Sequence, residues 1–478
     1  MGYIYTVMDL ISYVKTGLKN KRTYITYVST VCLLGFLIVL YVFHPGYLSP
    51  DSLNQLQQAI HGSYSEWHPP LMAIIWSYTI SFTHSYSILL YIFDILLWIS
   101  LWIMGCWAFR HRPGSPLAYI IPLLGFTPFI FFLVGVIWKD VFSGLLLFFL
   151  IAVSTAFDSL SKDSFKRYRF FVLAFGMLLL TVATSIRYNL LPAIVILTVW
   201  LMNKYALRTR LNFRKFSTFI FVFGVMVLMS SLIYVENLGI SKIYEVKKDH
   251  PNVVVYVDDI TMLPNNDEVI GASPLDSSSK DLLQNIDNKC KTFTVSRIFC
   301  LNDISSQNAA KKLQYSQYQN IQGTWLHAVA EDPTSVATNH LKNGWMFMID
   351  GGLYNWYPGM ATGAPSRVTN SAGLSFLSKY VYYTSRDFGF IFRPIFWLVI
   401  SIIIILRARR FAVEQATDII LIEIASITYI FSYFLVMQGF DYRYIYPSVL
   451  MTIMGAILCI GKSNTRIHGR KSKNIKRA

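Results

Sequence analysis

The dominant pattern along this chain is a series of long apolar runs separated by short polar segments. Several runs approach the roughly 20 consecutive apolar residues that a helix needs to cross a bilayer. Others are shorter, as helices beside irregular backbone can be. The pattern predicts an all-α polytopic membrane protein. The ten expected spanning helices cover 24–43, 87–109, 117–137, 141–157, 170–186, 190–202, 216–236, 388–406, 416–437 and 444–461.

One polar segment, 237–387, interrupts this series, and its roughly 150 residues are enough for a small domain. It mixes a strand-like run at 252–257 with helix-like runs at 323–331 and 335–348. We therefore expect a mixed α/β loop domain outside the membrane. The expected division of the chain is an N-terminal transmembrane module at 1–236 with a first external loop at 44–86, the loop domain at 237–387, C-terminal transmembrane helices at 388–461 and a basic tail at 462–478.

Composition and charge support a membrane protein and argue against a nucleic-acid-binding one. Hydrophobic residues make up 54% of the chain and charged residues only 14%, against about 25% charged in soluble domains. The net charge of +16 comes from basic clusters between apolar runs, which is the positive-inside pattern. No aromatic or helical reading module accompanies these clusters, so we expect no nucleic acid partner.

The same clusters predict sidedness, and the apolar run 71–84 decides it. If the N-terminus is cytoplasmic and 71–84 lies on the outer surface, every basic cluster falls inside. If 71–84 crosses, the clusters from Arg110 to Arg410 move outside. We therefore expect a multi-pass cell-membrane protein with both termini cytoplasmic. This topology places outside the loop 44–86, the pair Lys139-Asp140, the turn 187–189, the segment 237–387 and residues 439–444.

Polar residues that could carry chemistry begin in the loop after the first apolar run. Ser49-Pro50-Asp51 has the form of a helix start, with Ser49 as the cap, and Gly62 would end that helix. Asp51 either only favours the helix N-terminus or supplies a carboxylate for chemistry. His68 precedes two prolines, which block a helix. It suits contact with a phosphate or proton transfer, or it is an interfacial histidine.

Further candidates stand at the ends of later runs. Lys139-Asp140 is either a local ion pair or functional, because charges at a membrane span are costly. Arg187 and Arg443 are arginines on the expected outer side, where they could bind phosphate or anchor lipid headgroups. In the loop domain, Asp258-Asp259 could hold a divalent cation or form a solvated strand end, and Cys290 and Cys300 leave a disulfide open.

The order of these motifs resembles the GT-C superfamily of integral-membrane glycosyltransferases, in an uncharacterised bacterial branch. The order is one span, an external loop with an acidic residue in a short helix, a basic residue before Pro-Pro, and Lys-Asp at a later helix end. The resemblance covers most of 24–200 and the stretch 438–447. The motifs that carry it are Tyr47-Leu48-Ser49-Pro50-Asp51-Ser52, Trp67-His68-Pro69-Pro70-Leu71, Lys139-Asp140, Arg187-Tyr188-Asn189 and Asp441-Tyr442-Arg443-Tyr444-Ile445-Tyr446-Pro447.

The resemblance implies transfer of a sugar from a polyprenyl-phosphate donor to an extracytoplasmic glycan or lipid acceptor, such as cell-wall polysaccharide or teichoic acid. Asp51 would be the catalytic base or would orient the acceptor, and Asp140 would be the second acidic residue. His68 stands where relatives often have a lysine. The expected phosphate-binding residues are His68, Lys139, Arg187 and Arg443, and the expected substrate-binding residues are Tyr188, Asn189 and Asp441. No cofactor is firmly implied, and a divalent cation stays open. Membrane lipids are expected partners.

Two other functions stay open at this stage. A carrier or flippase for lipid-linked sugars would use ionisable residues inside its spans, and Asp94, Asp418 and Glu423 are candidates. A polysaccharide polymerase is chemically close but joins whole repeat units. The chain has no Walker loop and no His-Glu-x-x-His motif, which argues against nucleotide-driven pumping and the common zinc hydrolases.

Overall fold

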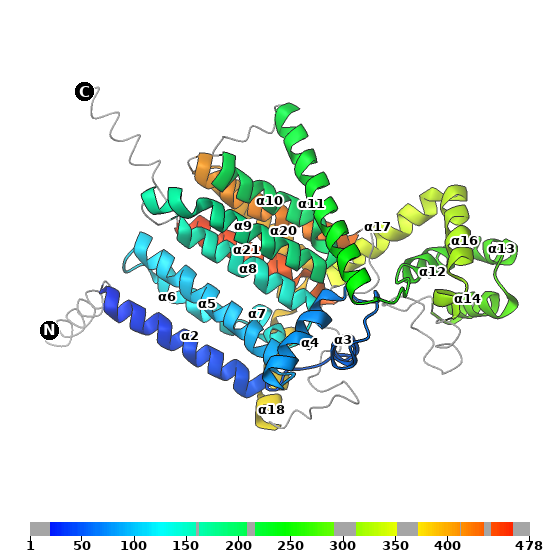
Figure 1. The fold of residues 1–478 in the computed structure, drawn as a ribbon, viewed down its shortest axis with the longest axis horizontal. Helices are drawn as coiled ribbons and strands as arrows, with labels where there is room; N and C mark the ends of the chain where they lie inside the picture. Colours follow the sequence, from blue (N-terminus) through cyan, green and yellow to red (C-terminus); the bar gives the residue numbers. More distant parts are fainter. Residues whose placement is uncertain are drawn as a thin grey trace.

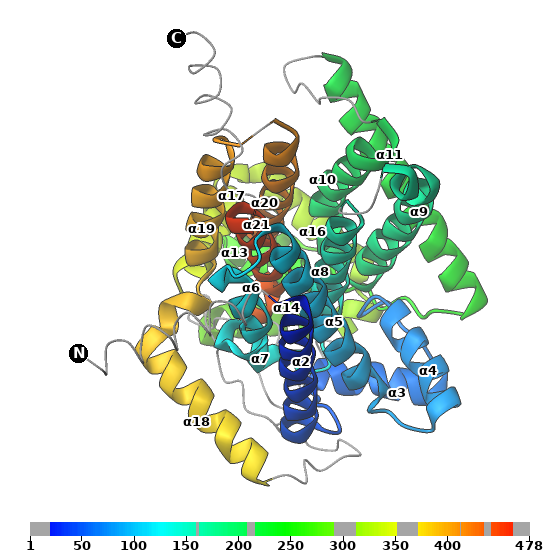
Figure 2. The same ribbon diagram turned by 90° about the vertical axis from the view of Figure 1, so that its left-hand side faces the viewer.

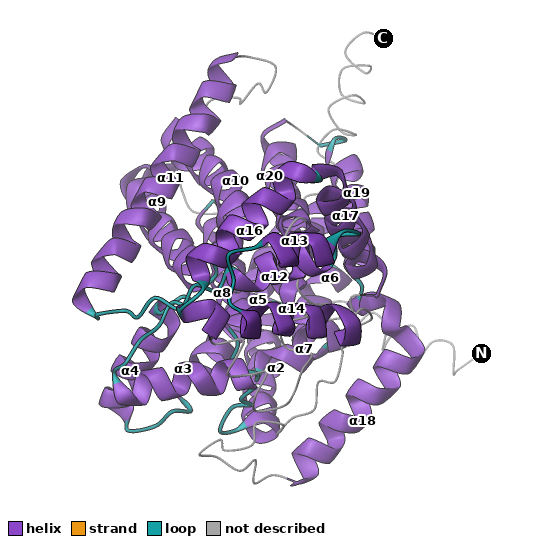
Figure 3. Cartoon of the chain, turned by 90° about the vertical axis from the view of Figure 1, so that its right-hand side faces the viewer, coloured by secondary structure: helices purple, strands orange, loops and turns teal. Residues whose placement is uncertain are grey.

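The computed structural model describes residues 20–158, 162–207, 216–290, 312–350, 371–411, 413–434 and 441–461. Every regular element within this part of the chain is a helix, apart from isolated β-bridges (Figure 3). Seven of these helices are long and apolar enough to cross a membrane. They are α2 (Lys21–Phe43), α5 (Ile88–His111), α8 (Lys139–Phe157), α9 (Lys162–Ile186), α11 (Phe216–Ile243), α20 (Val413–Phe434) and α21 (Tyr446–Gly461), the last taken together with the 3-10 turn Tyr442–Ile445 before it. The expected all-α polytopic architecture is confirmed.

Two expected spans are broken rather than straight. The run 117–137 forms α6 (Pro116–Ile120), a 3-10 turn and α7 (Pro128–Val134), with a 43° bend. The second break, of 52°, separates α18 (Ser371–Phe388) and its 3-10 extension from α19 (Pro394–Ala408). Both new helices begin on a proline, which has no N–H to donate and clashes with the preceding turn. Each bent pair can count as one span, which gives nine in the described residues.

The described residues hold up to nine candidate spans against the roughly ten expected, and the difference is the run 190–202. It forms α10 (Leu191–Met202), only 12 residues long, which continues into a π-helical turn at Asn203–Leu207. The run 71–84 forms α4 (Leu71–Thr83), with 13 residues. At 1.5 Å per residue such a helix rises about 20 Å, which is short of a bilayer core of about 30 Å. Figures 1 and 2 show α4 beside α3 (Pro50–His61) at one end of the bundle.

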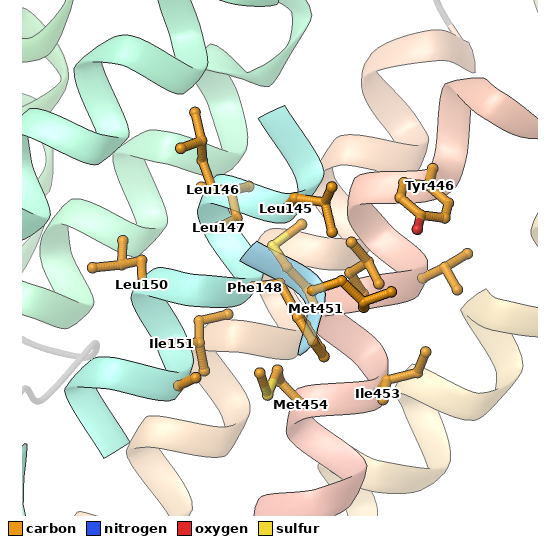
Figure 4. Packing of buried hydrophobic residues seen from close by; sticks show 14 of the residues in the cluster. Leu145, Leu146, Leu147, Phe148, Leu150, Ile151, Tyr446, Met451, Ile453 and Met454 are labelled. Carbon is orange, nitrogen blue, oxygen red and sulfur yellow. The ribbon is translucent and has the colours of Figure 1, made fainter. Parts of the chain in front are cut away.

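The centre of the bundle is the packing of α8 against α21. Side chains such as Leu145, Phe148 and Met451 fill the space between the two helices (Figure 4). Gly144 allows this close approach, because a Cβ there would lie 3.2 Å from the backbone of Pro447, and small residues permit tight contact between membrane helices. The peripheral α2 and α11 instead keep apolar faces exposed, as contact with lipid requires.

Because the helices alternate in direction, the polar residues at their termini lie at the two ends of the bundle. Helix α2 runs from the basic Lys21 toward the first loop, and α5 returns toward Arg110. At the first-loop end lie the start of α8, the end of α9 and the start of α21, together with α3 and α4 (Figure 1). Which end faces the cell exterior stays a prediction from the charge rule.

The expected mixed α/β loop domain is wrong, because its described residues form only helices. Its helices are α12 (Val253–Thr261), α13 (Asn266–Ala272), α14 (Ser277–Cys290) and α16 (Tyr318–Glu331), termed the loop unit here, and α17 (Pro333–Asp350) leads back to the bundle (Figure 1). The strand-like run lies in α12, where Val253, Val257 and Ile260 share one buried face. Burying such side chains is worth about 1.5–3 kcal/mol each, which exceeds their weak preference against helix. Cys290 and Cys300 lie outside the described side chains.

A Gly135→Ala variant should test the packing that ties the first loop to the bundle. A Cβ at Gly135 would lie 1.9 Å from Cγ of the buried Phe43 ring. Overpacking of this kind typically costs about 1–3 kcal/mol, so we expect a lower free energy of unfolding in detergent, measured by denaturant titration. Gly271→Ala is the matched control, since its Cβ would meet nothing within 4 Å. Equal stability of the two variants would contradict the packing described here.

Candidate active site

The first loop is fixed against the segment before α8. Tyr47 accepts from Ile137 N and donates its own N–H to Gly135 O, each at 3.0 Å. Ser49 caps α3 as expected, accepting from Ser52 N at 3.3 Å, and its hydroxyl also accepts from Trp138 Nε1 at 2.6 Å. These bonds place the first turn of α3 beside the first turn of α8, so Asp51 comes near the Lys139-Asp140 pair.

Asp51 forms an ion pair with an arginine from the far end of the chain. Its Oδ2 lies 2.9 Å from Nη1 of Arg443, and Nε of the same guanidinium lies 3.2 Å from Oδ2 of Asp441. Burial is the largest single influence on the pKa of Asp51 and raises it, but Arg443 and the other positive groups nearby together lower it by more, so the net pKa lies well below the usual range. Burial dominates at Asp441 and raises its pKa, although Arg443 opposes the shift.

His68 lies between Asp51 and Lys139. Its side chain is only 8% exposed, and its Nε2 lies 3.8 Å from Asp51 Oδ1. Burial and the charge of Lys139 lower the pKa of His68 to about 3, although Asp51 acts in the opposite direction. The imidazole is therefore neutral near pH 7. Nδ1 then accepts a hydrogen bond from Lys139 Nζ at 2.9 Å, and Nε2 carries its proton on the side of Asp51.

Asp140 pairs with the other arginine. Its Oδ1 lies 2.9 Å from Nε of Arg187, and both side chains are almost fully buried. The hydroxyl of Tyr433 on α20 accepts from the same guanidinium at 2.9 Å and lies 3.5 Å from Asp140 Oδ1. Tyr429 extends this contact, since its hydroxyl lies 3.0 Å from that of Tyr433. The pair is thus held by two phenols as well as by its own charges.

Tyr444 joins the two arginine pairs into one cluster. Its ring centroid lies 5.5 Å from Cζ of Arg187 and 5.1 Å from Cζ of Arg443, within the range of cation–π attraction. The charge cluster, as it is termed here, consists of Asp51, His68, Lys139, Asp140, Arg187, Asp441 and Arg443. It holds two arginines, one lysine and three aspartates around a neutral histidine.

Other predicted site residues do not join this cluster. Tyr188 and Asn189 are exposed, and the Tyr188 hydroxyl donates to Asn237 Oδ1 on α11 at 3.0 Å. Asp259 lies in the loop unit, where it accepts from Trp325 Nε1 and pairs with His340 Nε2, each at 2.7 Å. Asp258 is its buried neighbour on α12. The described residues contain no group of three or more side chains suited to a metal ion.

Sequence reasoning missed the aromatic residues that hold the cluster. Trp138, Tyr433 and Tyr444 each contact a charged member, and the Arg443 guanidinium lies 4.7 Å from the Trp138 ring. Aromatic residues at helix ends are typical of membrane interfaces, so their position alone does not indicate a site. The adjacency of Trp138 and Tyr444 to the predicted Lys139 and Arg443 was the signal available.

The fold and the cluster define a class: a polytopic, all-helical membrane protein with a buried charge cluster at one end of its bundle. Comparisons with protein-family models, curated proteins and solved structures find no match for the chain.

Proposed function

We propose that this protein is a membrane glycosyltransferase. It would move a sugar from a polyprenyl-phosphate donor to an extracytoplasmic glycan or lipid acceptor. The observation that carries the proposal is the convergence of separate segments, at α3, the loop before α4, α8, the turn after α9 and the start of α21, on one charge cluster. Transfer from a phosphate needs cations for the leaving group and a carboxylate for the acceptor, and the cluster contains both.

Lys139 is the cation best suited to meet an incoming phosphate. Its Nζ donates to the neutral His68, and no carboxylate of the described residues lies within 4.0 Å of it. Arg187 and Arg443, by contrast, are each paired with a carboxylate. A donor phosphate that contacts Lys139 would therefore gain charge compensation without first breaking an ion pair, and the arginines beside it would stabilise the negative charge that develops on departure.

Asp51 would accept the proton of the acceptor hydroxyl. Its side chain is 35% exposed, so an acceptor can reach it. A carboxylate so tightly paired is a weak base, because efficient proton acceptors have a pKa near the working pH. A donor phosphate that attracts Arg443 would weaken that pairing and raise the basicity of Asp51. The donor would thus prepare the base that the acceptor needs.

The reaction can be written with its atoms balanced. The acceptor oxygen attacks the anomeric carbon, the bond from that carbon to the phosphate oxygen breaks, and the hydroxyl proton moves to Asp51. Polyprenyl phosphate leaves with the electron pair and is held by the cations. A single displacement of this kind inverts the configuration at the anomeric carbon.

The test is transfer by the purified full chain in lipid nanodiscs. The protein is incubated with a labelled polyprenyl-phosphate monosaccharide and a membrane extract that contains acceptors. An enzyme releases one polyprenyl phosphate for each sugar transferred, whereas a carrier leaves the donor intact. Intact donor with every extract would contradict the proposal.

A carrier is the second candidate, and one observation favours it. Asp94 and Glu423 are completely buried within α5 and α20, where ionisable side chains often mark a transport pathway. The third residue considered, Asp418, forms a salt bridge with Lys204 at 3.4 Å at the opposite end of the bundle from the charge cluster. A polymerase would instead require a donor that carries a whole repeat unit, and the same assay with such donors distinguishes it.

A Lys139→Gln variant should weaken donor binding more than it weakens turnover. The loss of one charge-assisted hydrogen bond is worth about 1.5–3 kcal/mol, so we expect the donor KM to rise about 10- to 100-fold. Lys342→Gln is the control, since that lysine is exposed on α17. An unchanged KM would show that Lys139 does not contact the donor.

A further inference from the structure

The segment between α3 and α4 is attached to the chain that enters the loop unit. Ser65 and Lys247 form a parallel β-bridge. Lys247 N donates to Tyr64 O at 2.9 Å, and Glu66 N donates to Lys247 O at 3.0 Å. The residues just before His68 are therefore hydrogen-bonded to the residues that follow α11.

Two side chains of this segment then contact the loop unit or its approach. Oε1 of Glu66 accepts from His250 N at 3.1 Å, and the His250 ring stacks on Tyr318 of α16 with centroids 3.9 Å apart. Trp67 packs against the hydrophobic core of the loop unit. His68, the next residue, belongs to the charge cluster. Glu66 and Trp67 thus contact the loop unit and its approach, and the next residue, His68, contacts the charge cluster.

The backbone around this segment leaves little freedom to absorb movement. His68 is followed by Pro69 and Pro70, and α4 begins at once after them, so proline rings fix the backbone beyond His68. On the other side, Glu245 and His250 have φ of 48° and 50°. Non-glycine residues keep this left-handed backbone only where surrounding contacts impose it, and such positions concentrate at functional sites.

We infer that Glu66 and Trp67 are positioning residues through which the loop unit sets the place of His68 and, through His68, of Lys139. In its consequence for sugar transfer, this inference rests on the proposed function. A displacement of the loop unit would move Trp67, and the rigid His68-Pro69-Pro70 link would carry that movement into the charge cluster. The loop unit thus helps to position the site.

The first test reads the position of His68 without any transfer reaction. The imidazole faces Asp51 from α3, Lys139 from α8, and the charges of Arg187 and Arg443. In the full chain with labelled histidine, its NMR signal should show a pKa near 3, and loss of the signal in His68→Gln assigns it among the nine histidines. Trp67→Ala should move that pKa upward toward the usual 6.5, because the ring loses its enclosed place.

The second test uses the transfer assay with matched variants. Trp67→Ala should raise the donor KM about 10-fold with a smaller change in kcat, and Trp67→Phe should restore most of the wild-type KM because a ring still packs on the loop unit. Trp345→Ala is the control, as that tryptophan is 55% exposed on α17. If Trp67→Ala does not fold, Glu66→Ala is the alternative variant. The Glu66 side chain is 39% exposed, so its removal should disturb folding less. It should move the His68 pKa in the same direction.

The outcomes separate the two proposals. A His68 pKa that is unchanged in both Trp67→Ala and Glu66→Ala overturns the positioning role, whatever the transfer assay gives. If the His68 pKa shifts in the variants but the wild-type protein transfers no sugar, the positioning role is supported and the glycosyltransferase proposal is overturned. A shift together with a raised donor KM supports both.

Discussion

Asp51→Asn should reduce the rate of sugar transfer by about 100- to 10,000-fold, which is the usual contribution of a positioned general base. Asparagine keeps the shape of the side chain but cannot accept the acceptor proton. The first turn of α3 should persist, because Ser49 caps it independently of Asp51. The measurement is the initial rate of polyprenyl phosphate release in nanodiscs, with folding followed by thermal denaturation.

The matched control for this variant is Asp387→Asn. Asp387 also pairs with an arginine, Arg386, at 2.7 Å, but both side chains are about half exposed on α18 and neither belongs to the charge cluster. That variant should retain full activity. If Asp51→Asn also transferred sugar at the wild-type rate, Asp51 would have no catalytic role and the assignment of the base would fail.

Arg443→Gln should reduce transfer about 10- to 100-fold, as expected for the loss of a charged contact worth about 1.5–3 kcal/mol. It should also change the dependence on pH. Burial raises the pKa of Asp51, and Arg443 is the strongest of several charges that together lower it by more. Without Arg443 the strongest of these lowering charges is lost, so the Asp51 pKa rises. We therefore expect kcat/KM of the variant to fall as pH decreases, in a range where the wild-type rate is still constant.

Two further variants check this second prediction. Arg443→Lys keeps the positive charge but loses the fork that reaches both Asp51 and Asp441. It should therefore keep the wild-type pH profile with an intermediate rate. Arg386→Gln, in the exposed pair on α18, should change neither rate nor profile. If Arg443→Gln gave the wild-type profile, the charge of Arg443 would not govern the protonation of Asp51.

Local sequence signals predicted the elements that surround the cluster. Ser49 caps α3, and Gly62 ends it with φ of 66°, as the sequence indicated. These features depend on residues only a few positions apart, so they can be predicted without tertiary structure. The alternation of spans also predicted that Asp51, Lys139 and Arg187 would share one end of the bundle, because each stands at a helix end.

Other features depended on packing that no local pattern records. The run 252–257 has the composition of a strand, yet it is helical because Val253, Val257 and Ile260 face a core built from α14 and α16. The breaks before Pro128 and Pro394 follow from proline, but proline alone does not decide whether a span bends or continues. The short α10 was predicted to be a span because short apolar helices can occur beside irregular backbone.

The sequence by itself determined that this is a helical membrane protein and which polar residues stand at the helix ends, because apolar length and capping are local properties. Only the tertiary structure decided which of those residues pair. Asp51 meets Arg443 and Asp140 meets Arg187 because α8 packs against α21, α9 and α5. The partner of a buried charge is chosen by such packing between helices distant in the chain, and no pattern of neighbouring residues encodes it.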